Sequence, residues 1–287
     1  MIELDLSVNQ LTGRIPSEIG LLDGTKSILL NNNIFTHSIP SEIGSLGSLE
    51  ILNLENNILM GSIPSEIGNL GKLRVIDIGR NRLEGTIPIQ MSNLLLLEFL
   101  SGENNYLIAP IPSELGLLGK MTGLRLGENL LTGTLTSELM ELTTLKYLDL
   151  QNAGLYGTIP WDQLARMTNL ELLVLQNNAL SGMLSSTLEA MTSLIQLGLS
   201  SNLLRGSIPS EIGFITNLMY MDLSWNLLSG SIPSTILNLS KLNILYLQEN
   251  DSLCGILEDI CDTVPDLTIR PQKWNQNTCF SCTCPCQ

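Results

Sequence analysis

Leu194–Pro209, which reads LIQLGLSSNLLRGSIP, is the stretch of sequence that decides the fold. Its pattern LxxLxLxxNxLxGxIP, in which x is any residue, recurs along most of the chain. The Ile or Leu of the Ile-Pro position lies at residues 15, 39, 63, 87, 111, 135, 159, 184, 208, 232 and 256. Successive copies are 24 residues apart, except for a spacing of 25 between Ile159 and Leu184. A fixed period of this size is typical of solenoids, so the eleven copies predict a repeat protein rather than a single globular core.

The alternating part of each copy predicts a short β-strand, because residues two apart lie on the same face of a strand. Leu52 and Leu54, like Leu197 and Leu199, should point inward. The segment after the Pro, such as residues 64–70, is short enough to favour a 3-10 turn over a long helix. We therefore predict an α/β solenoid with a parallel β-sheet on the concave face and short 3-10 or irregular segments on the convex face. The repeats should cover residues 1–257, and a Cys-rich cap residues 258–287.

Two further columns of the repeat predict backbone geometry. An Asn follows the strand in nearly every copy, where a buried amide can satisfy the N–H and C=O groups of the turning backbone. Ala153 replaces it once, so that turn must be satisfied in another way. A Gly two residues before the Ile-Pro position indicates positive φ, although His37 and Ala109 stand there in two copies. Gly102 replaces an inward Leu, and we expect a cavity or a local collapse beside it.

Composition and charge limit which classes of partner the chain can bind, and the sequence also bears on how it is targeted. The formal charge of −14 and the pI near 4.4 argue against a nucleic-acid partner, since nothing would neutralise phosphates. Much of the acidity comes from a Glu that recurs in register with the repeat, at residues 18, 42, 66, 114, 138 and 211, and that we interpret as a solvated carboxylate. No apolar run is long enough for a transmembrane helix. Met1 leads directly into a strand, without a signal peptide or an N-terminal cap, so we expect the chain to be a fragment.

The motif LxxLxLxxNxLTGxIPSEIGxL, found over residues 2 to about 260, resembles the plant-specific class of leucine-rich repeat. That class forms the ectodomains of receptor-like kinases and receptor-like proteins, and the polygalacturonase-inhibiting proteins. The resemblance implies a right-handed superhelix, with a second short strand around the L-T/S-G-x-I-P segment. It also implies that peptides, glycans or partner proteins, a co-receptor among them, bind on the inner or lateral face. NDSLCG at residues 250–255 is similar to the last repeat of such ectodomains. The Cys spacing of the tail is similar to secreted algal leucine-rich repeat proteins.

All cysteines lie at the end of the chain, at Cys254, Cys261, Cys279, Cys282, Cys284 and Cys286. An even number in an extracellular type of fold indicates a disulfide-stapled cap. We favour a bond between Cys254 and Cys261, and the other four cysteines allow three pairings. The alternative is a zinc site formed by those four, which contain one C-x-x-C but lack a second.

No catalytic constellation is present in the sequence. His37 is the only histidine, and no partner spacing supports a Ser-His-Asp or Cys-His arrangement around it. Phosphate-loop, dinucleotide and H-E-x-x-H motifs are missing. The carboxylates recur in register with the repeat, as a scaffold requires, rather than as an isolated pair. We therefore predict a protein that is not an enzyme and needs no cofactor.

The outward strand positions supply the candidate binding residues, because the fold does not require large aromatic or Arg side chains on a solvated face. These types are enriched in binding hot spots, although aromatic residues also simply suit strands. The candidates are Phe99, Arg125, Tyr147, Asp149, Tyr220, Asp222, Trp225 and Tyr246. We favour binding most for the group from Tyr220 to Tyr246, since large apolar exposure usually has a use.

Two sequons allow N-glycosylation, at Asn238-Leu-Ser and Asn250-Asp-Ser. Asn250 belongs to the buried Asn column, so we predict that only Asn238 is modified. The expected function is a secreted or cell-surface recognition module that binds protein, peptide or glycan without catalysis. It would reach a membrane only through a segment outside this chain. The alternatives are an inhibitor of an extracellular hydrolase and a structural or adhesive wall protein.

Overall fold

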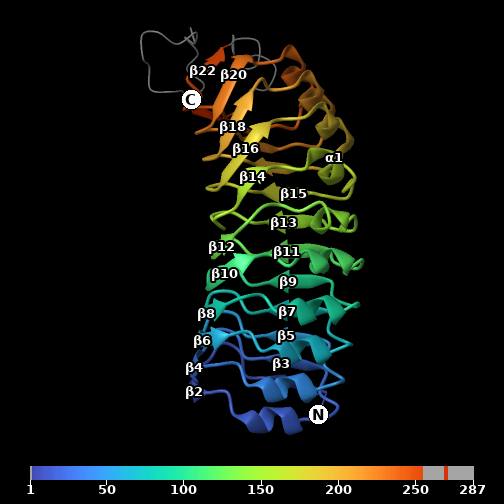
Figure 1. Ribbon diagram of the computed structural model, residues 1–287, viewed down its shortest axis with the longest axis vertical. Helices are drawn as coiled ribbons and strands as arrows, with labels where there is room; N and C mark the ends of the chain where they lie inside the picture. The colour runs from blue at the N-terminus through green and yellow to red at the C-terminus, as the bar shows by residue number, and fades with distance from the viewer. Residues whose placement is uncertain (1, 255–267, 271–287) are drawn as a thin grey trace. The chain divides into compact units, whose positions relative to one another are not determined.

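A computed structural model describes residues 2–254 and 268–270, and it divides the chain into two compact units. The first unit is Met1–Leu145 and the second is Lys146–Gln287. Each unit stacks coils in which a short strand, a turn, a second strand and a 3-10 segment follow one another (Figure 1). The predicted α/β solenoid is therefore confirmed, and so are the second strand and the 3-10 segments.

The first unit holds two parallel sheets, which we call its major and minor sheets. The major-sheet strands are β1 (Glu3–Asp5), β3 (Ser27–Leu29), β5 (Ile51–Asn53), β7 (Val75–Asp77), β9 (Phe99–Ser101) and β11 (Gly123–Arg125). The minor-sheet strands are β2 (Thr12–Arg14), β4 (Ile34–His37), β6 (Ile58–Ser62), β8 (Arg82–Gly85), β10 (Tyr106–Pro110) and β12 (Leu130–Thr132). The 3-10 segments are η1 (Ser17–Leu21), η2 (Ser41–Ser45), η3 (Ser65–Asn69), η4 (Ile89–Asn93), η5 (Ser113–Leu117) and η6 (Leu139–Glu141).

The second unit repeats this arrangement. Its major sheet contains β13 (Tyr147–Asp149), β15 (Leu172–Val174), β17 (Gln196–Gly198), β19 (Tyr220–Asp222), β21 (Ile244–Tyr246) and β23 (Thr268–Arg270). Its minor sheet contains β14 (Tyr156–Thr158), β16 (Ala179–Met183), β18 (Leu203–Gly206), β20 (Leu227–Ser231) and β22 (Ser252–Cys254). The remaining segments are α1 (Trp161–Leu164), where one repeat is longer, and η7 (Ser186–Ala190), η8 (Ser210–Phe214) and η9 (Ser234–Asn238).

Strand β23 lies in the segment predicted as a cap, where it pairs in parallel with β21 and continues the stack. The predicted boundary at residue 257 falls outside the described residues.

The core of each coil is built from the inward Leu and Ile columns. Leu52, Leu54, Leu197 and Leu199 are fully buried, as the alternation predicts. The hydrophobic effect drives this burial, at about 25 cal/mol per Å² of apolar surface. At Gly102 the neighbouring side chains close in, as the second of the two predicted alternatives requires: an added Cβ would lie 3.2 Å from Cδ2 of Leu126 and 3.6 Å from Cδ1 of Leu107.

A ladder of buried asparagines ties neighbouring coils together. The Oδ1 atom of Asn57 accepts from the backbone N–H of Phe35 at 3.0 Å, in the preceding coil. Its Nδ2 donates to the carbonyls of Leu30 at 3.0 Å and Leu54 at 3.1 Å. Each amide thus satisfies backbone groups that the turn removes from the sheet.

The coil that carries Ala153 is satisfied by its neighbour. Oδ1 of Asn178 accepts from both Ala153 N at 3.1 Å and Leu155 N at 3.0 Å. Its Nδ2 donates to the carbonyl of Leu150 at 2.9 Å. One Asn therefore serves two backbone N–H groups, which confirms that this turn is satisfied in another way.

The Gly column has positive φ, as predicted, with values such as 77° at Gly61 and 96° at Gly182. His37 and Ala109 adopt the same left-handed backbone, with φ of 65° and 69°. A side chain in this region costs about 1–2 kcal/mol, so these two positions carry strain that the other copies avoid.

Candidate functional site

Phe99 and Arg125 of the first unit form one contact on the outward face of the major sheet. Phe99 lies opposite Gly123 in the next strand, and a Cβ added at Gly123 would come 2.5 Å from the ring. The Phe99 ring can therefore occupy this position only because residue 123 is glycine and has no Cβ. The guanidinium carbon of Arg125 is 5.7 Å from the ring centroid, which is a cation–π distance. Nε of Arg125 is buried without a hydrogen-bond partner.

The surroundings of this pair are anionic. Arg80 lies between two carboxylates, with its Nε 3.6 Å from Glu55 Oε1 and 3.7 Å from Glu103 Oε1. Burial raises the pKa of Glu55, and the neighbouring carboxylate of Asp77 raises it further. Arg80 is largely exposed, so these ion pairs contribute little to stability.

In the second unit, Tyr220, Asp222 and Tyr246 lie together. The rings of Tyr220 and Tyr246 have centroids 6.0 Å apart and an interplanar angle of 84°, an edge-to-face pair. The Tyr220 hydroxyl donates to Asp222 Oδ2 at 3.3 Å. Oδ1 of Asp222 accepts from the N–H of Ser224 at 3.1 Å and from its hydroxyl at 2.6 Å. Asp222 is only 8% exposed, although it lies on the outward face of the sheet.

Trp225 lies in the turn after β19 and is 57% exposed. Its φ is 54°, an unusual value for a bulky residue. The equivalent residues Arg80 and Asn104 of the first unit have φ of 53° and 55°. The turn of the coil therefore imposes this backbone, and it leaves the indole exposed beside the major sheet.

Tyr147 and Asp149 lie on β13 and do not join this group. The Tyr147 hydroxyl donates to Glu171 Oε2 at 3.2 Å, and the other Glu171 oxygen pairs with Lys146 Nζ at 3.2 Å. Oδ1 of Asp149 accepts from the N–H of Gln151 at 3.1 Å. Strands β15 and β17 separate β13 from β19, which corresponds to about 14 Å at ordinary strand spacing.

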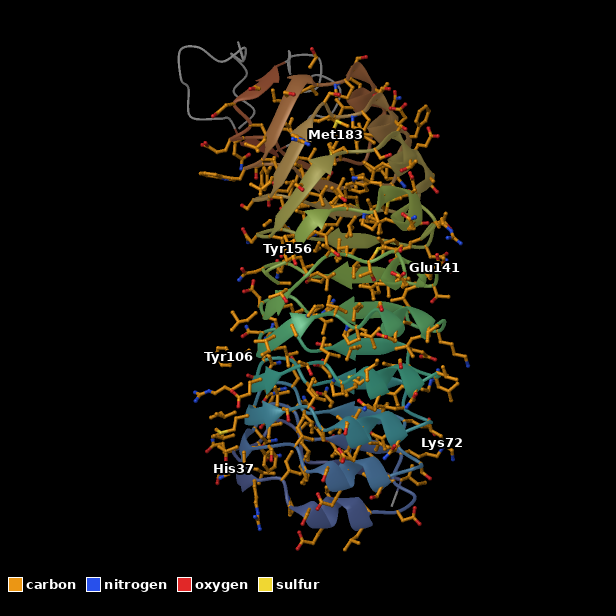
Figure 2. The ribbon with its side chains drawn as sticks, viewed as in Figure 1. His37, Lys72, Tyr106, Glu141, Tyr156 and Met183 are labelled. Atoms are coloured by element: carbon orange, nitrogen blue, oxygen red, sulfur yellow. The ribbon has the colours of Figure 1, made fainter. Side chains whose placement is uncertain are left out.

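Sequence reasoning missed the exposed side chains of the minor sheets. Tyr106, Ile108 and Leu130 are exposed in the first unit, and Ile108 lies opposite Leu130 in the next strand. Figure 2 shows Tyr106 of β10 at the edge of the ribbon, and Tyr156 of β14 is 53% exposed. The alternation within the LxGxI segment could have revealed these positions.

The other predicted sites divide between described and undescribed residues. Asn238 is exposed at the end of η9. Asn250 is fully buried, and its Nδ2 donates to the carbonyls of Leu223 and Leu247. For the cysteines, only the backbone of Cys254 is described, and Cys261, Cys279, Cys282, Cys284 and Cys286 lie outside the described residues.

Within residues 2–254 and 268–270, His, Cys, Asp and Glu side chains do not gather in threes as a metal site would require. No helix in the same residues is long and apolar enough to cross a membrane. His37 is exposed, and its Nδ1 is 2.9 Å from the hydroxyl of Thr36.

Comparisons with known proteins identify the family. The Leucine Rich Repeat family model matches residues 1–22, 48–70, 72–94 and 217–239. No curated protein matches the chain. The Arabidopsis receptor kinase HAESA, solved with the peptide hormone IDA and the co-receptor SERK1, is 30% identical with a TM-score of 0.84. That match covers 95% of this chain and 50% of the HAESA chain. The plant peptide hormone receptor RGFR1, solved with RGF2, is 32% identical with a TM-score of 0.76 and coverages of 93% and 46%.

A plant ice-binding protein is similar over most of both chains. It is 31% identical, with a TM-score of 0.77, and the match covers 88% of this chain and 81% of that protein. By contrast, the chain spans about half the length of the receptor structures. The repeat motif, the stacked parallel sheets and these matches agree. This chain belongs to the leucine-rich repeat family and has the α/β solenoid fold of plant receptor ectodomains.

Proposed function

We propose that this chain is a non-catalytic, extracellular recognition module that binds a peptide or protein segment. We place the binding site on the outward face of the major sheet in the second unit, at Tyr220, Trp225 and Tyr246. The observation that carries the proposal is the edge-to-face pair of Tyr220 and Tyr246 on this outward face, with the exposed Trp225 in the turn after β19. Two of the similar structures are receptors solved with peptide hormones, and one of them includes a co-receptor.

The scaffold suits such binding because it is already ordered. Neighbouring strands and buried asparagines fix the backbone beneath the rings, so little conformational entropy remains to be lost on association. Tyr and Trp add large contact areas with few rotatable bonds. Binding energy in interfaces is concentrated in such residues.

The test is a selection of linear 12-residue peptides, displayed on phage, against the intact chain. We expect Tyr246→Ala to weaken binding of the selected peptides by about tenfold or more, as loss of a hot spot does. The matched control is Tyr156→Ala, which removes the same side chain from a minor-sheet position that is 53% exposed. Isothermal titration calorimetry gives both affinities. Equal losses, or a loss only at Tyr156, would overturn the proposed site.

The ice-binding neighbour favours a second candidate function, in which the minor sheet orders water. The observation that favours this second candidate is an exposed hydroxyl at the same position of successive coils, as at Ser38, Ser62 and Thr86. Strand stacking places such hydroxyls about 4.8 Å apart. We would then expect thermal hysteresis in a freezing assay, and a smaller effect for Thr86→Lys. If the chain produces no thermal hysteresis, this candidate function is excluded.

A further inference from the structure

We infer that the segment bound on the major sheet of the second unit carries a Lys or Arg side chain. Its charged group docks against Asp222, beside the rings of Tyr220 and Tyr246. This inference rests on the proposed function and specifies the chemistry of its ligand. Three independent observations support it: the environment of Asp222, the geometry of the ring pair and the charge of the face.

In the described part of the chain, Asp222 is a buried carboxylate with neutral partners. Its described partners, the Ser224 N–H, the Ser224 hydroxyl and the Tyr220 hydroxyl, are all neutral. Among the side chains that the structure describes, no Lys or Arg forms an ion pair with Asp222. Burying a carboxylate is costly unless it is paired, and neutral hydrogen bonds offset only part of that cost.

Asp77 of the first unit shows which of the hydrogen bonds to Asp222 is common to the repeat. It occupies the same position of its coil, and its Oδ1 also accepts from the N–H two residues later, that of Gly79, at 3.0 Å. This hydrogen bond therefore belongs to the turn of the repeat. The serine hydroxyl bond also recurs, since Oδ1 of Asp5 accepts from the Ser7 hydroxyl at 2.7 Å. The Tyr220 hydroxyl and the deep burial distinguish Asp222.

The ring pair adds a second attraction for a cation. An aromatic ring has a negative face, and a cation within about 6 Å of its centroid is attracted. Because Tyr220 and Tyr246 meet edge to face at 84°, their ring faces are nearly perpendicular. A Lys or Arg side chain that reaches Asp222 passes beside these rings, and its methylene groups can pack on them.

The outward face of the major sheet in the second unit carries more acidic than basic residues. The strand and turn positions of the described second unit hold the carboxylates of Asp149, Glu171, Asp222 and Glu249, and two basic residues, Lys146 and Arg270. Lys146 is already paired with Glu171. Such a face attracts a basic segment during encounter and repels an acidic one. A glycan or a neutral peptide would use the rings but leave this charge unmatched.

The test uses the peptides selected against the intact chain. We expect Lys or Arg to be enriched among them. The best peptide is then made in two forms, with Lys and with acetyl-lysine, which keeps the length and removes the charge. Acetylation should weaken binding to the unmodified protein by about tenfold or more. Acetylation should change the affinity for Asp222→Asn very little, because the carboxylate that pairs with the lysine has already been removed. Asp77→Asn is the matched control and should leave both affinities unchanged.

The outcomes separate the two proposals. If acetylation weakens binding equally on the unmodified protein and on Asp222→Asn, the inference is wrong, while the proposed function stands. It is also wrong if peptides bind through Tyr246 but show no enrichment of cations. If no peptide binds the chain, both proposals fail. If Asp222→Asn proves unstable, Tyr246→Leu is tested in its place. Acetylation of the peptide must then weaken binding to Tyr246→Leu by a smaller factor than it weakens binding to the unmodified protein.

Discussion

Replacement of Asn202 by Ala is expected to lower the free energy of unfolding by about 3–5 kcal/mol. Oδ1 of Asn202 accepts from Leu180 N at 2.9 Å, and its Nδ2 donates to Leu175 O at 2.9 Å and Leu199 O at 3.1 Å. The side chain is buried, so water cannot replace these bonds. Each buried backbone group left without a partner costs about 1–3 kcal/mol.

Urea denaturation of the two proteins, followed by circular dichroism, measures this loss. The control is Asn217→Ala, which removes an amide that also bonds to a neighbouring coil, at Thr192 O, but lies at the surface. Its loss should stay below about 1 kcal/mol, because water can take its place. Equal losses at Asn202 and Asn217 would mean that the asparagine ladder is not a main source of stability.

Replacement of Gly68 by Ala is expected to cost about 1–3 kcal/mol, because it forces two coils apart. Gly68 lies in η3, and a Cβ there would meet the backbone oxygen of Gln90 in η4 and come 2.7 Å from its Cβ. Neither contact is with the flexible end of a side chain, so the backbone itself must move. The Gly of each Ser-Glu-Ile-Gly segment is thus a point of close approach between coils.

The melting temperature of Gly68→Ala, compared with that of Gly71→Ala, tests this account. Gly71 lies in the following turn, where an added Cβ meets nothing within 4 Å. Its replacement should be neutral or slightly stabilising, because Ala restricts the unfolded chain. A melting temperature lowered as much by Gly71→Ala as by Gly68→Ala would show that the loss comes from the backbone conformation and not from crowding.

The repeat period made the fold predictable in detail. Alternation placed Leu52 and Leu54 inward, the Asn column predicted the buried amides, and the Gly column predicted positive φ. These features recur because every coil meets the same two neighbours. A single sequence that contains many copies therefore samples one local environment many times, and chance residues average out.

The candidate site was less predictable because it depends on contacts that differ from coil to coil. Phe99 lies over Gly123 only because the two residues are register partners and residue 123 has no side chain. Asp222 is buried because of the Tyr220 and Ser224 side chains around it. Alternation could place these residues outward, but it could not predict which outward side chains cover one another.

The left-handed position that ends the turn after each major-sheet strand from β1 to β21 has a consequence for how such a chain can change. Residues as different as Val8, Arg80 and Trp225 adopt φ of 53–54° there. The coil holds this backbone with Val, Arg, Glu, Ser or Trp as well as with Asn, so the position accepts varied side chains at a cost of about 1–2 kcal/mol for those that disfavour the left-handed region. Each coil thus offers natural selection one site where recognition can be altered while the scaffold keeps its stability.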